Sequence, residues 1–363
     1  MKNLFLPFFI LLIFSCQNNS LKVSDQFDVY TGTNIAHWLS QSQTRGEERK
    51  KFFSRSDVIA IAAMGFDHIR LPIDEVQMWD DDGNRHEDAF DLMLNCIDWC
   101  SDNKLKVIID LHILRSHYFN AKEKPLWTDV KEQEKFYDLW RDLSSSLHQF
   151  PNNLVAYELM NEAVADDPEE WNDLLGRAME VIRQLEPKRT IVIGSNRWQS
   201  VNTFDELKIP ENDPHILLSF HFYEPMVLTH YLASWTEFKE YQGPAHYPGN
   251  LISEEEYNAL PDEMKPVAKR WVDVEFNKEI ILQMWKKPIL IAKELGLPLY
   301  CGEFGVYGKA PGEDRIRWYQ DMVELFNENG IGYANWNYKS NNFGLISKDG
   351  VQYEELITIV SPD

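Results

Sequence analysis

The stretch LVAYELMNE, residues 154–162, is an apolar run that ends in an amide and a carboxylate, Asn161 and Glu162. A short run with few polar residues is typical of a strand that is buried on both faces of a parallel sheet. The polar pair at its end either lies in a solvated loop or faces a pocket in which a carboxyl group takes part in chemistry. The rest of the sequence distinguishes these two possibilities.

The same arrangement recurs along the chain, because eight strand-like runs are each followed by a helical pattern or a short connection. Eight βα units in about 310 residues predict an α/β fold, a single-domain (β/α)8 TIM barrel over residues 28–363. A doubly wound sheet would usually carry G-x-G-x-x-G in its first turn, but residues 31–39 read TGTNIAHWL. The expected strands are Val29–Asn34, His68–Ile73, Lys106–His112, Leu154–Glu162, Thr190–Asn196, Ile216–Tyr223, Pro298–Phe304 and Gly332–Tyr338. The expected helices are Asp57–Met64, Ala89–Asn103, Gln133–Phe150, Glu169–Glu186, Phe276–Leu295 and Ile316–Asn329, with a short one near Phe204–Leu207.

One connection is much longer than the others. The segment Glu224–Asp273 follows the sixth expected strand, whereas βα loops commonly have about 2–6 residues. It is rich in aromatic residues, among them Trp235, Tyr241 and Tyr247. We expect an extended loop insertion that forms a subdomain or a wall over the mouth of the barrel.

The composition limits the partners. A formal net charge of -22 argues against nucleic acid, because a polyanion needs a basic face. A neutral polymer is compatible with this charge. The 12 Trp and 15 Tyr fit a large core, and they also fit rings that stack on a ligand.

The first 15 residues are expected to be a signal peptide, with Lys2 before an apolar run, Leu4–Phe14, that is short for a bilayer span. Residues 13–16, IFSC, are similar to a bacterial lipobox, in which Cys16 is acylated after cleavage; an ordinary signal peptide that contains a Cys is the alternative. The lipobox predicts an exported lipoprotein with a tether over residues 16–27, anchored through Cys16 to a bacterial membrane, periplasmic or at the cell surface. A monomer is expected. The remaining cysteines are expected to be buried small apolar side chains: Cys96, Cys100 and Cys301.

Chemistry in a (β/α)8 barrel collects at the carboxyl ends of the strands. Two of these ends carry Glu162 and Glu303, on the fourth and seventh strands, and their side chains are expected to face each other across the barrel mouth. Acetal cleavage uses such a pair, because one carboxylic acid protonates the leaving oxygen and one carboxylate attacks or activates water. A gap of roughly 5–5.5 Å gives retention and roughly 6.5–9.5 Å gives inversion. The other ends carry Asn34, Arg70, Asp110, His112, Asn161, Asn196, His221, Tyr223 and Trp336.

The neighbours of the two glutamates predict different roles. An attacking carboxylate must stay ionised, which Arg70 and a hydroxyl from Tyr223 would favour at Glu303. A proton donor must keep its proton near neutral pH, which the apolar residues on either side of Glu162 would favour. Asn161 can hydrogen-bond a sugar 2-hydroxyl.

The motifs IRLP (69–72), DLH (110–112), LMNE (159–162), HFY (221–223), GEFG (302–305) and NW (335–336) resemble glycoside hydrolase family 5 of the retaining clan A, over about Val29 to Lys339. The resemblance implies a retaining enzyme that acts on a β-glycan, most simply an endo-β-1,4-glucanase, without cofactor or metal. It assigns the acid/base to Glu162 and the nucleophile to Glu303. The implied supporting residues are Asn161 at the sugar 2-hydroxyl, Arg70 and Tyr223 at the nucleophile, His221 beside the acid/base, His112 along the sugar and Trp336 as the stacking floor.

The sequence leaves several β-glycans open as the substrate. The residues after His112, HILRSHYFN, depart from the family's common Pro-Gly turn, and Tyr231 and Leu232 replace a common Gln-Gly. Both changes alter loops around the outer sugar sites, so mixed-linkage glucan, mannan, xyloglucan and an exo-acting glycosidase remain alternatives. The tryptophans in or near loops are either sugar platforms or loop packing: Trp38, Trp79, Trp127, Trp198 and Trp235.

Two other classes of protein fit part of the sequence pattern. A metallohydrolase could take ligands from Asp110, His112 and His221, but H-x-H and H-E-x-x-H are absent from the sequence and both glutamates would lack a role. A non-catalytic glycan-binding lipoprotein would keep aromatic platforms, yet it would not need both carboxylates.

Overall fold

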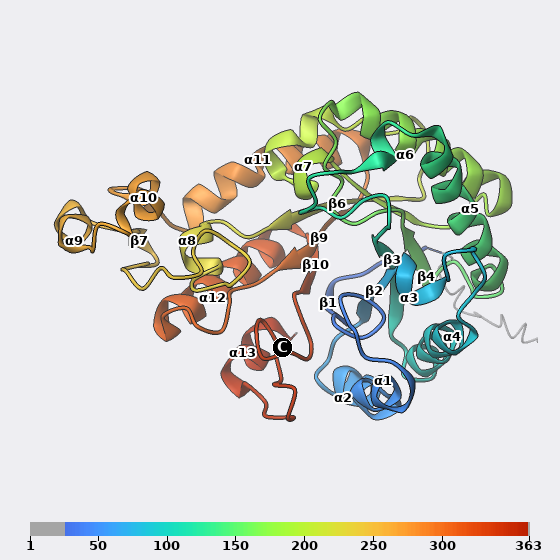
Figure 1. Ribbon diagram of the computed structural model, residues 1–363, viewed down its shortest axis with the longest axis horizontal. Helices are drawn as coiled ribbons and strands as arrows, with labels where there is room; N and C mark the ends of the chain where they lie inside the picture. Colours follow the sequence, from blue (N-terminus) through green and yellow to red (C-terminus); the bar gives the residue numbers. More distant parts are fainter. Residues whose placement is uncertain (1–25, 362–363) are drawn as a thin grey trace, which may run out of the picture.

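The computed structural model describes residues 26–361 of the chain. Within this range, eight parallel strands close into a barrel in the order β1-β10-β9-β6-β5-β4-β3-β2, so the predicted (β/α)8 TIM barrel is confirmed (Figure 1). The expected signal peptide, Cys16 and most of the expected tether lie outside the described residues. The barrel strands are β1 (Thr31–Asn34), β2 (His68–Asp74), β3 (Lys106–Ile113), β4 (Val155–Glu158), β5 (Ile191–Gly194), β6 (Ile216–Phe222), β9 (Leu299–Phe304) and β10 (Gly332–Asn335).

Helices follow most of the barrel strands, and the six long ones predicted from periodicity are present with boundaries shifted by a few residues. The helix α6 illustrates why these segments form helices. Pro168 occupies its first turn, Asp167 caps it, and its buried stripe runs from Trp171 to Ile182 at helical spacing. Outside the insertion, the helices are α1 (Gly46–Phe52), α2 (Arg55–Ala63), α3 (Glu75–Met78), α4 (Glu87–Asp102), η1 (Pro125–Trp127), α5 (Val130–Leu147), α6 (Pro168–Leu185), α7 (Asn196–Gln199), η2 (Val201–Glu206), α11 (Lys278–Leu295), α12 (Gly312–Asn329) and α13 (Glu354–Val360).

Several expected strand ends were wrong. The fourth strand ends at Glu158 rather than at Glu162. The Asn161 N–H still donates to the Leu111 carbonyl of β3 at 3.1 Å, but Glu162 has φ 45°, a left-handed conformation that an extended strand cannot contain.

Four other expected end positions also differ. Asn196 begins α7 instead of ending β5, and Arg70 lies in the interior of β2, which continues to Asp74. Tyr223 and Trp336 each lie one residue beyond a strand. Arg70 therefore projects from within the barrel, beneath the residues at the mouth.

The insertion between β6 and α11 contains α8 (Met226–Thr229), β7 (Gly249–Asn250), α9 (Glu254–Ala259), α10 (Lys265–Ala268), η3 (Lys269–Trp271) and β8 (Glu275–Phe276). Only its first part borders the cavity at the mouth, through residues between 224 and 236. The remainder lies against α12, where the Tyr247 hydroxyl donates to Asp321 at 2.7 Å and Arg317 donates to the Tyr247 carbonyl. Figure 1 shows α9, α10 and β7 projecting away from the barrel strands. The expected wall is therefore limited to the start of the insertion.

The three described cysteines, Cys96, Cys100 and Cys301, are free and buried, as predicted. Over residues 26–361, we find no helix with the length and apolar character that a membrane span requires.

Candidate active site

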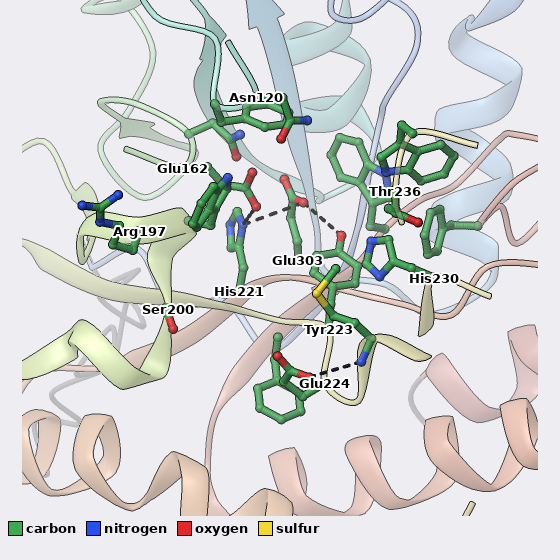
Figure 2. Close-up of a pocket in the computed structure, with 18 of the residues that line it drawn as sticks. Asn120, Glu162, Arg197, Ser200, His221, Tyr223, Glu224, His230, Thr236 and Glu303 are labelled. Atoms are coloured by element: carbon green, nitrogen blue, oxygen red, sulfur yellow. Dashed lines mark hydrogen bonds and ion pairs between the residues drawn. The ribbon is translucent and has the colours of Figure 1, made fainter. Parts of the chain in front are cut away.

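Glu162 and Glu303 face each other at the carboxyl end of the barrel, and each lies within a few residues of the end of its strand. A carboxylate oxygen of each, together with a ring nitrogen of His221, lies in a group whose atoms are all within 4.8 Å of one another. Figure 2 shows the two carboxyl groups side by side above His221 and Tyr223. Both glutamates are almost completely buried, with 9% and 5% of their surface exposed.

Arg70 lies beneath Glu303 and is fully buried. Its guanidinium donates to Glu303 Oε1 at 2.8 Å and holds Glu158 by two contacts, the shorter at 2.6 Å. Burial lowers the pKa of Arg70, but the carboxylates of Asp110, Glu158 and Glu303 more than compensate and raise it well above its ordinary value. Its remaining contacts are Asn34 Oδ1 at 2.9 Å, Asn161 Oδ1 at 2.8 Å and Asp110 Oδ2 at 3.0 Å.

The two glutamates differ in acidity for a visible reason. Burial, followed by the charge of Glu303, raises the pKa of Glu162 well above its ordinary value. Burial also raises the pKa of Glu303, but Arg70 and the Tyr223 hydroxyl, which donates at 3.0 Å, oppose the shift. Glu303 therefore loses its proton first, and Glu162 retains a proton to donate.

His221 lies between the two carboxylates. Its Nδ1 is 3.1 Å from Glu162 Oε1 and 3.8 Å from Glu303 Oε2 (Figure 2). Burial lowers its pKa well below the ordinary value, so the ring is neutral and adds no charge to the pair.

His112 and Trp336 form a second side of the site. Their rings stack with centroids 5.4 Å apart and an interplanar angle of 9°. His112 Nδ1 lies 2.7 Å from Asp110 Oδ2, and its Nε2 lies 3.1 Å from the Gln41 amide nitrogen. A neutral ring with the proton on Nδ1 satisfies both contacts, and burial lowers the His112 pKa to about 4.

Asn161 presents a free donor to the cavity. Its Oδ1 accepts from Arg70, which fixes the orientation of the amide, while its buried Nδ2 has no partner within the described part of the chain. A hydroxyl of a bound ligand can supply that acceptor.

The cavity around these residues has a volume of 570 Å³ and extends past both glutamates. In Figure 2, Arg197 lies beyond Glu162, and His230 and Thr236 lie beyond Glu303. An acid and a nucleophile in the middle of a cleft can act on a bond whose two sides are both bound. This geometry suits acetal cleavage by two carboxylates.

Residues 32–342 match the cellulase family, glycosyl hydrolase family 5. The chain belongs to glycosyl hydrolase family 5. It is 33% identical over 338 residues to endoglucanase C of Acetivibrio thermocellus, covering 91% of this chain and 97% of that protein. It is 29% identical to cellodextrinase A of Ruminococcus flavefaciens, covering 84% and 83% respectively.

The crystal structure of endoglucanase Cel5A from the hyperthermophilic Thermotoga maritima has the same fold, with a TM-score of 0.73 and 23% identity over 91% of this chain and 96% of that one. Membership of the family makes this chain an O-glycosyl hydrolase.

The loop tryptophans of this family 5 enzyme separate into two groups. Trp38 and Trp79 are buried, and each indole N–H donates to a protein oxygen, so they pack the fold. Trp127 packs edge-on against His117 outside the cavity lining. Trp198 and Trp235 are 43% and 49% exposed and line the cavity, which leaves these two as candidate sugar platforms.

Sequence reasoning missed several residues that hold the site of this family 5 enzyme. Glu158 carries a carboxylate in the middle of a buried strand and pairs with Arg70, and Gln199 donates to Glu158 at 3.1 Å. The sequence does contain an indication of the role of Glu158, because an acidic residue within an apolar run needs a buried cation as its partner. Gln199 carried no such signal, because its contact depends on a loop conformation.

The three ligands that a metallohydrolase would take from this sequence, Asp110, His112 and His221, do not form a metal site in the described part of the chain. Asp110 and His112 contact each other and are occupied by Arg70 and Gln41. Within residues 26–361, the one group of three side chains with the spacing of a metal site is Glu162, His221 and Glu303, which includes both carboxyl groups that acetal cleavage would use.

Proposed function

We propose that this family 5 enzyme is an endo-β-1,4-glucanase that cleaves its substrate with retention of configuration. The observation that carries the retaining mechanism is the short gap between Glu162 and Glu303, whose oxygens lie within 4.8 Å. That gap fits direct attack by a carboxylate better than the roughly 6.5–9.5 Å that an inverting enzyme needs for a water molecule.

The first step forms a covalent intermediate. A Glu303 oxygen attacks the anomeric carbon while Glu162 transfers its proton to the glycosidic oxygen, and the bond between that carbon and oxygen breaks. The leaving chain departs as an alcohol, and Glu162 is left as a carboxylate.

The second step reverses the roles. Glu162 takes a proton from a water molecule, the water oxygen attacks the anomeric carbon, and Glu303 leaves as a carboxylate. Two displacements restore the original configuration. Arg70 and Tyr223 stabilise Glu303 whenever it is ionised, through contacts of 2.8 and 3.0 Å.

The remaining site residues bind the sugar in this proposal. Asn161 donates its free Nδ2–H to the 2-hydroxyl of the ring under attack, where the contact strengthens as charge develops. Trp336 forms the floor on which that ring stacks, and His112 lies along its edge. His221 remains beside Glu162.

Endo action is supported by the shape of the cleft. Because the acid lies on the leaving-group side of the cleaved bond, the leaving chain would extend past Glu162 toward Trp198. The other end of the cavity extends toward Trp235. The relatives named endoglucanase C and cellodextrinase A support a β-1,4-glucan over the alternatives. Mannan stays in the test, because Thermotoga maritima Cel5A was solved with mannotriose as well as with cellobiose.

A polysaccharide screen with product sizing tests the proposal. Carboxymethylcellulose, mixed-linkage glucan, xyloglucan, mannan and xylan are each digested, and Glu303→Gln serves as the inactive control. A rapid fall in the viscosity of carboxymethylcellulose with a ladder of cello-oligosaccharides is expected. Release of a single short product from the chain end, or turnover of mannan or xyloglucan alone, would contradict the assignment.

We also propose that the enzyme is exported and anchored as a monomeric lipoprotein through Cys16, on a bacterial membrane facing the periplasm or the cell surface. The support is the sequence IFSC at residues 13–16 after an apolar run. Labelling with a radioactive fatty acid tests it, with Cys16→Ser as the matched variant. The wild type should be labelled and sediment with membranes, and the variant should do neither. Light scattering of the chain without residues 1–15 measures the mass of the particle.

A further inference from the structure

We propose that Gln199 and His117 are positioning residues that hold the backbone of Glu162 in place for proton transfer. The inference rests on the proposed role of Glu162 as the acid/base. The inference follows from the contacts of the two peptide groups beside Glu162, because a side chain holds each of them. The Glu162 N–H donates to Gln199 Oε1 at 3.1 Å, and the Glu162 carbonyl lies 3.2 Å from His117 Nε2.

Glu162 needs this support because its backbone is strained. Its φ of 45° places a residue with a side chain in the left-handed region, which costs about 1–3 kcal/mol unless the surroundings enforce it. Gln199 is the last residue of α7, the short segment after β5, and His117 comes from the loop after β3. The connections that follow β5 and β3, on opposite sides of β4, therefore supply the restraint.

Gln199 itself has an unusual backbone conformation, because most of α7 is not helical in its dihedral angles. Arg197, Trp198 and Gln199 have φ of 57°, 63° and 51°, three consecutive residues in the left-handed region. The Trp198 N–H donates to the Ala163 carbonyl, which ties this turn to the residue after Glu162. A Cβ at Gly194 would lie 2.5 Å from the Gln199 side chain, so glycine is needed there to admit that side chain.

The other end of the Gln199 amide is connected to the nucleophile through Glu158 and Arg70. Its Nε2 donates to Glu158 at 3.1 Å, Glu158 accepts from Arg70 at 2.6 Å, and Arg70 donates to Glu303 at 2.8 Å. A chain of hydrogen bonds thus connects the backbone of the acid with the carboxylate of the nucleophile. Gln199 is placed to set the distance between the two glutamates.

His117 acts as a donor from the opposite side. It is 1% exposed, and burial lowers its pKa to about 4, so the ring is neutral at ordinary pH. With its proton on Nε2, it donates to the Glu162 carbonyl. Trp127 packs edge-on against the ring with centroids 5.1 Å apart and restricts its rotation.

Misplacement of Glu162 should affect substrates with poor leaving groups more than substrates with good ones. A proton donor must lie within hydrogen-bond reach of the leaving oxygen, and a misplacement of about 1 Å costs on the order of 100-fold. A leaving group that is already stable as an anion does not need the proton. Loss of Gln199 or His117 should therefore slow cleavage of natural substrates far more than cleavage of activated ones.

The test compares two substrates on four variants. Gln199→Met and His117→Phe remove the contacts, His117→Gln retains an N–H donor, and Glu162→Ala sets the limit for complete loss of the acid. On cellotetraose, kcat/KM should fall roughly 10- to 100-fold for Gln199→Met and His117→Phe. On 2,4-dinitrophenyl β-cellobioside the loss should be about 3-fold or less, and His117→Gln should recover part of the cellotetraose rate.

A matched control separates positioning from general destabilisation. Gln77 is another buried glutamine with two hydrogen bonds, to Ser42 and Arg49, and it does not line the cavity. Gln77→Met should lower the melting temperature while leaving the ratio of the two substrate rates unchanged.

The outcomes separate the two proposals. If Gln199→Met, or His117→Phe, loses the same factor in kcat/KM on both substrates, the positioning role of that residue is overturned. If Gln199→Met does not fold, the two His117 variants decide the matter alone. A wild type that hydrolyses neither substrate would instead overturn the proposed function.

Discussion

The carboxyl groups of Glu162 and Glu303 approach within 4.8 Å, oxygen to oxygen, across the mouth of the barrel. A gap this short predicts that the first product carries the β configuration of the substrate, because two displacements occur at the same carbon. Proton NMR of a fresh digest of cellotetraose measures the anomer before it equilibrates. Early appearance of the α anomer would show that water attacks directly and would reject Glu303 as the nucleophile.

Azide should rescue an enzyme that lacks the acid/base Glu162. We expect Glu162→Ala to lose about 10²- to 10⁴-fold in kcat on cello-oligosaccharides, because no group protonates the leaving oxygen. On 2,4-dinitrophenyl β-cellobioside, added azide should restore turnover and yield a β-glycosyl azide, since azide attacks the glycosyl-enzyme without base assistance. Glu303→Gln is the control and should show no such product. The same azide product from Glu303→Gln would exchange the two roles.

Tyr223 should set the acid side of the pH profile. Its hydroxyl donates to Glu303 at 3.0 Å and lowers the pKa of that carboxyl, so Tyr223→Phe raises it. The nucleophile acts when it is ionised, that is, above its pKa, and activity is lost as the pH falls through that value. We therefore expect the acidic limb of kcat/KM to move to higher pH. Tyr231→Phe, whose hydroxyl contacts the Gly243 carbonyl, is the matched control and should leave the limb in place.

The exposed indole of Trp198 should matter only to long substrates. It is 43% exposed and lines the cavity next to Arg197. In the proposed mechanism it lies on the leaving-group side of Glu162. Trp198→Ala should raise KM for cellotetraose by roughly 3- to 10-fold, equivalent to about 1 kcal/mol of apolar contact, and leave aryl cellobiosides unaffected. Tyr353→Ala, an exposed aromatic outside this cavity, provides the comparison. An unchanged KM would assign Trp198 to packing.

A second buried ion pair, at the end of the barrel opposite the active site, should affect stability but not activity. Arg189 is 1% exposed, pairs with Glu186 at 2.7 Å and donates to the Val155 carbonyl at the start of β4, the end opposite the active site. Arg189→Met leaves the Glu186 carboxylate buried without its cation, which costs about 3–5 kcal/mol. Denaturant unfolding of the variant measures this loss. KM and kcat of the folded fraction should equal those of the wild type, and a change in either would show coupling through the barrel.

The sequence by itself determined the architecture and the chemical pair. Apolar runs alternate with helical stripes because strands buried on both faces and helices buried on one face impose different spacings, and that pattern is local. Because parallel strands end at one edge of a barrel, Glu162 and Glu303 could be placed at the same mouth without coordinates. The same reasoning predicted Arg70 and Tyr223 as neighbours of Glu303, the resemblance to the family added His221 beside Glu162, and the structure contains all three contacts.

The tertiary structure alone decided how close the two carboxylates lie and what holds them there. The left-handed φ of Glu162, its contacts with Gln199 and His117, and the restriction of the insertion's wall to residues 224–236 all depend on loops that meet in space. These loops are separated by tens of residues along the chain. Their conformation follows from the hydrogen bonds they make with one another, so no local pattern of apolar and polar residues encodes it.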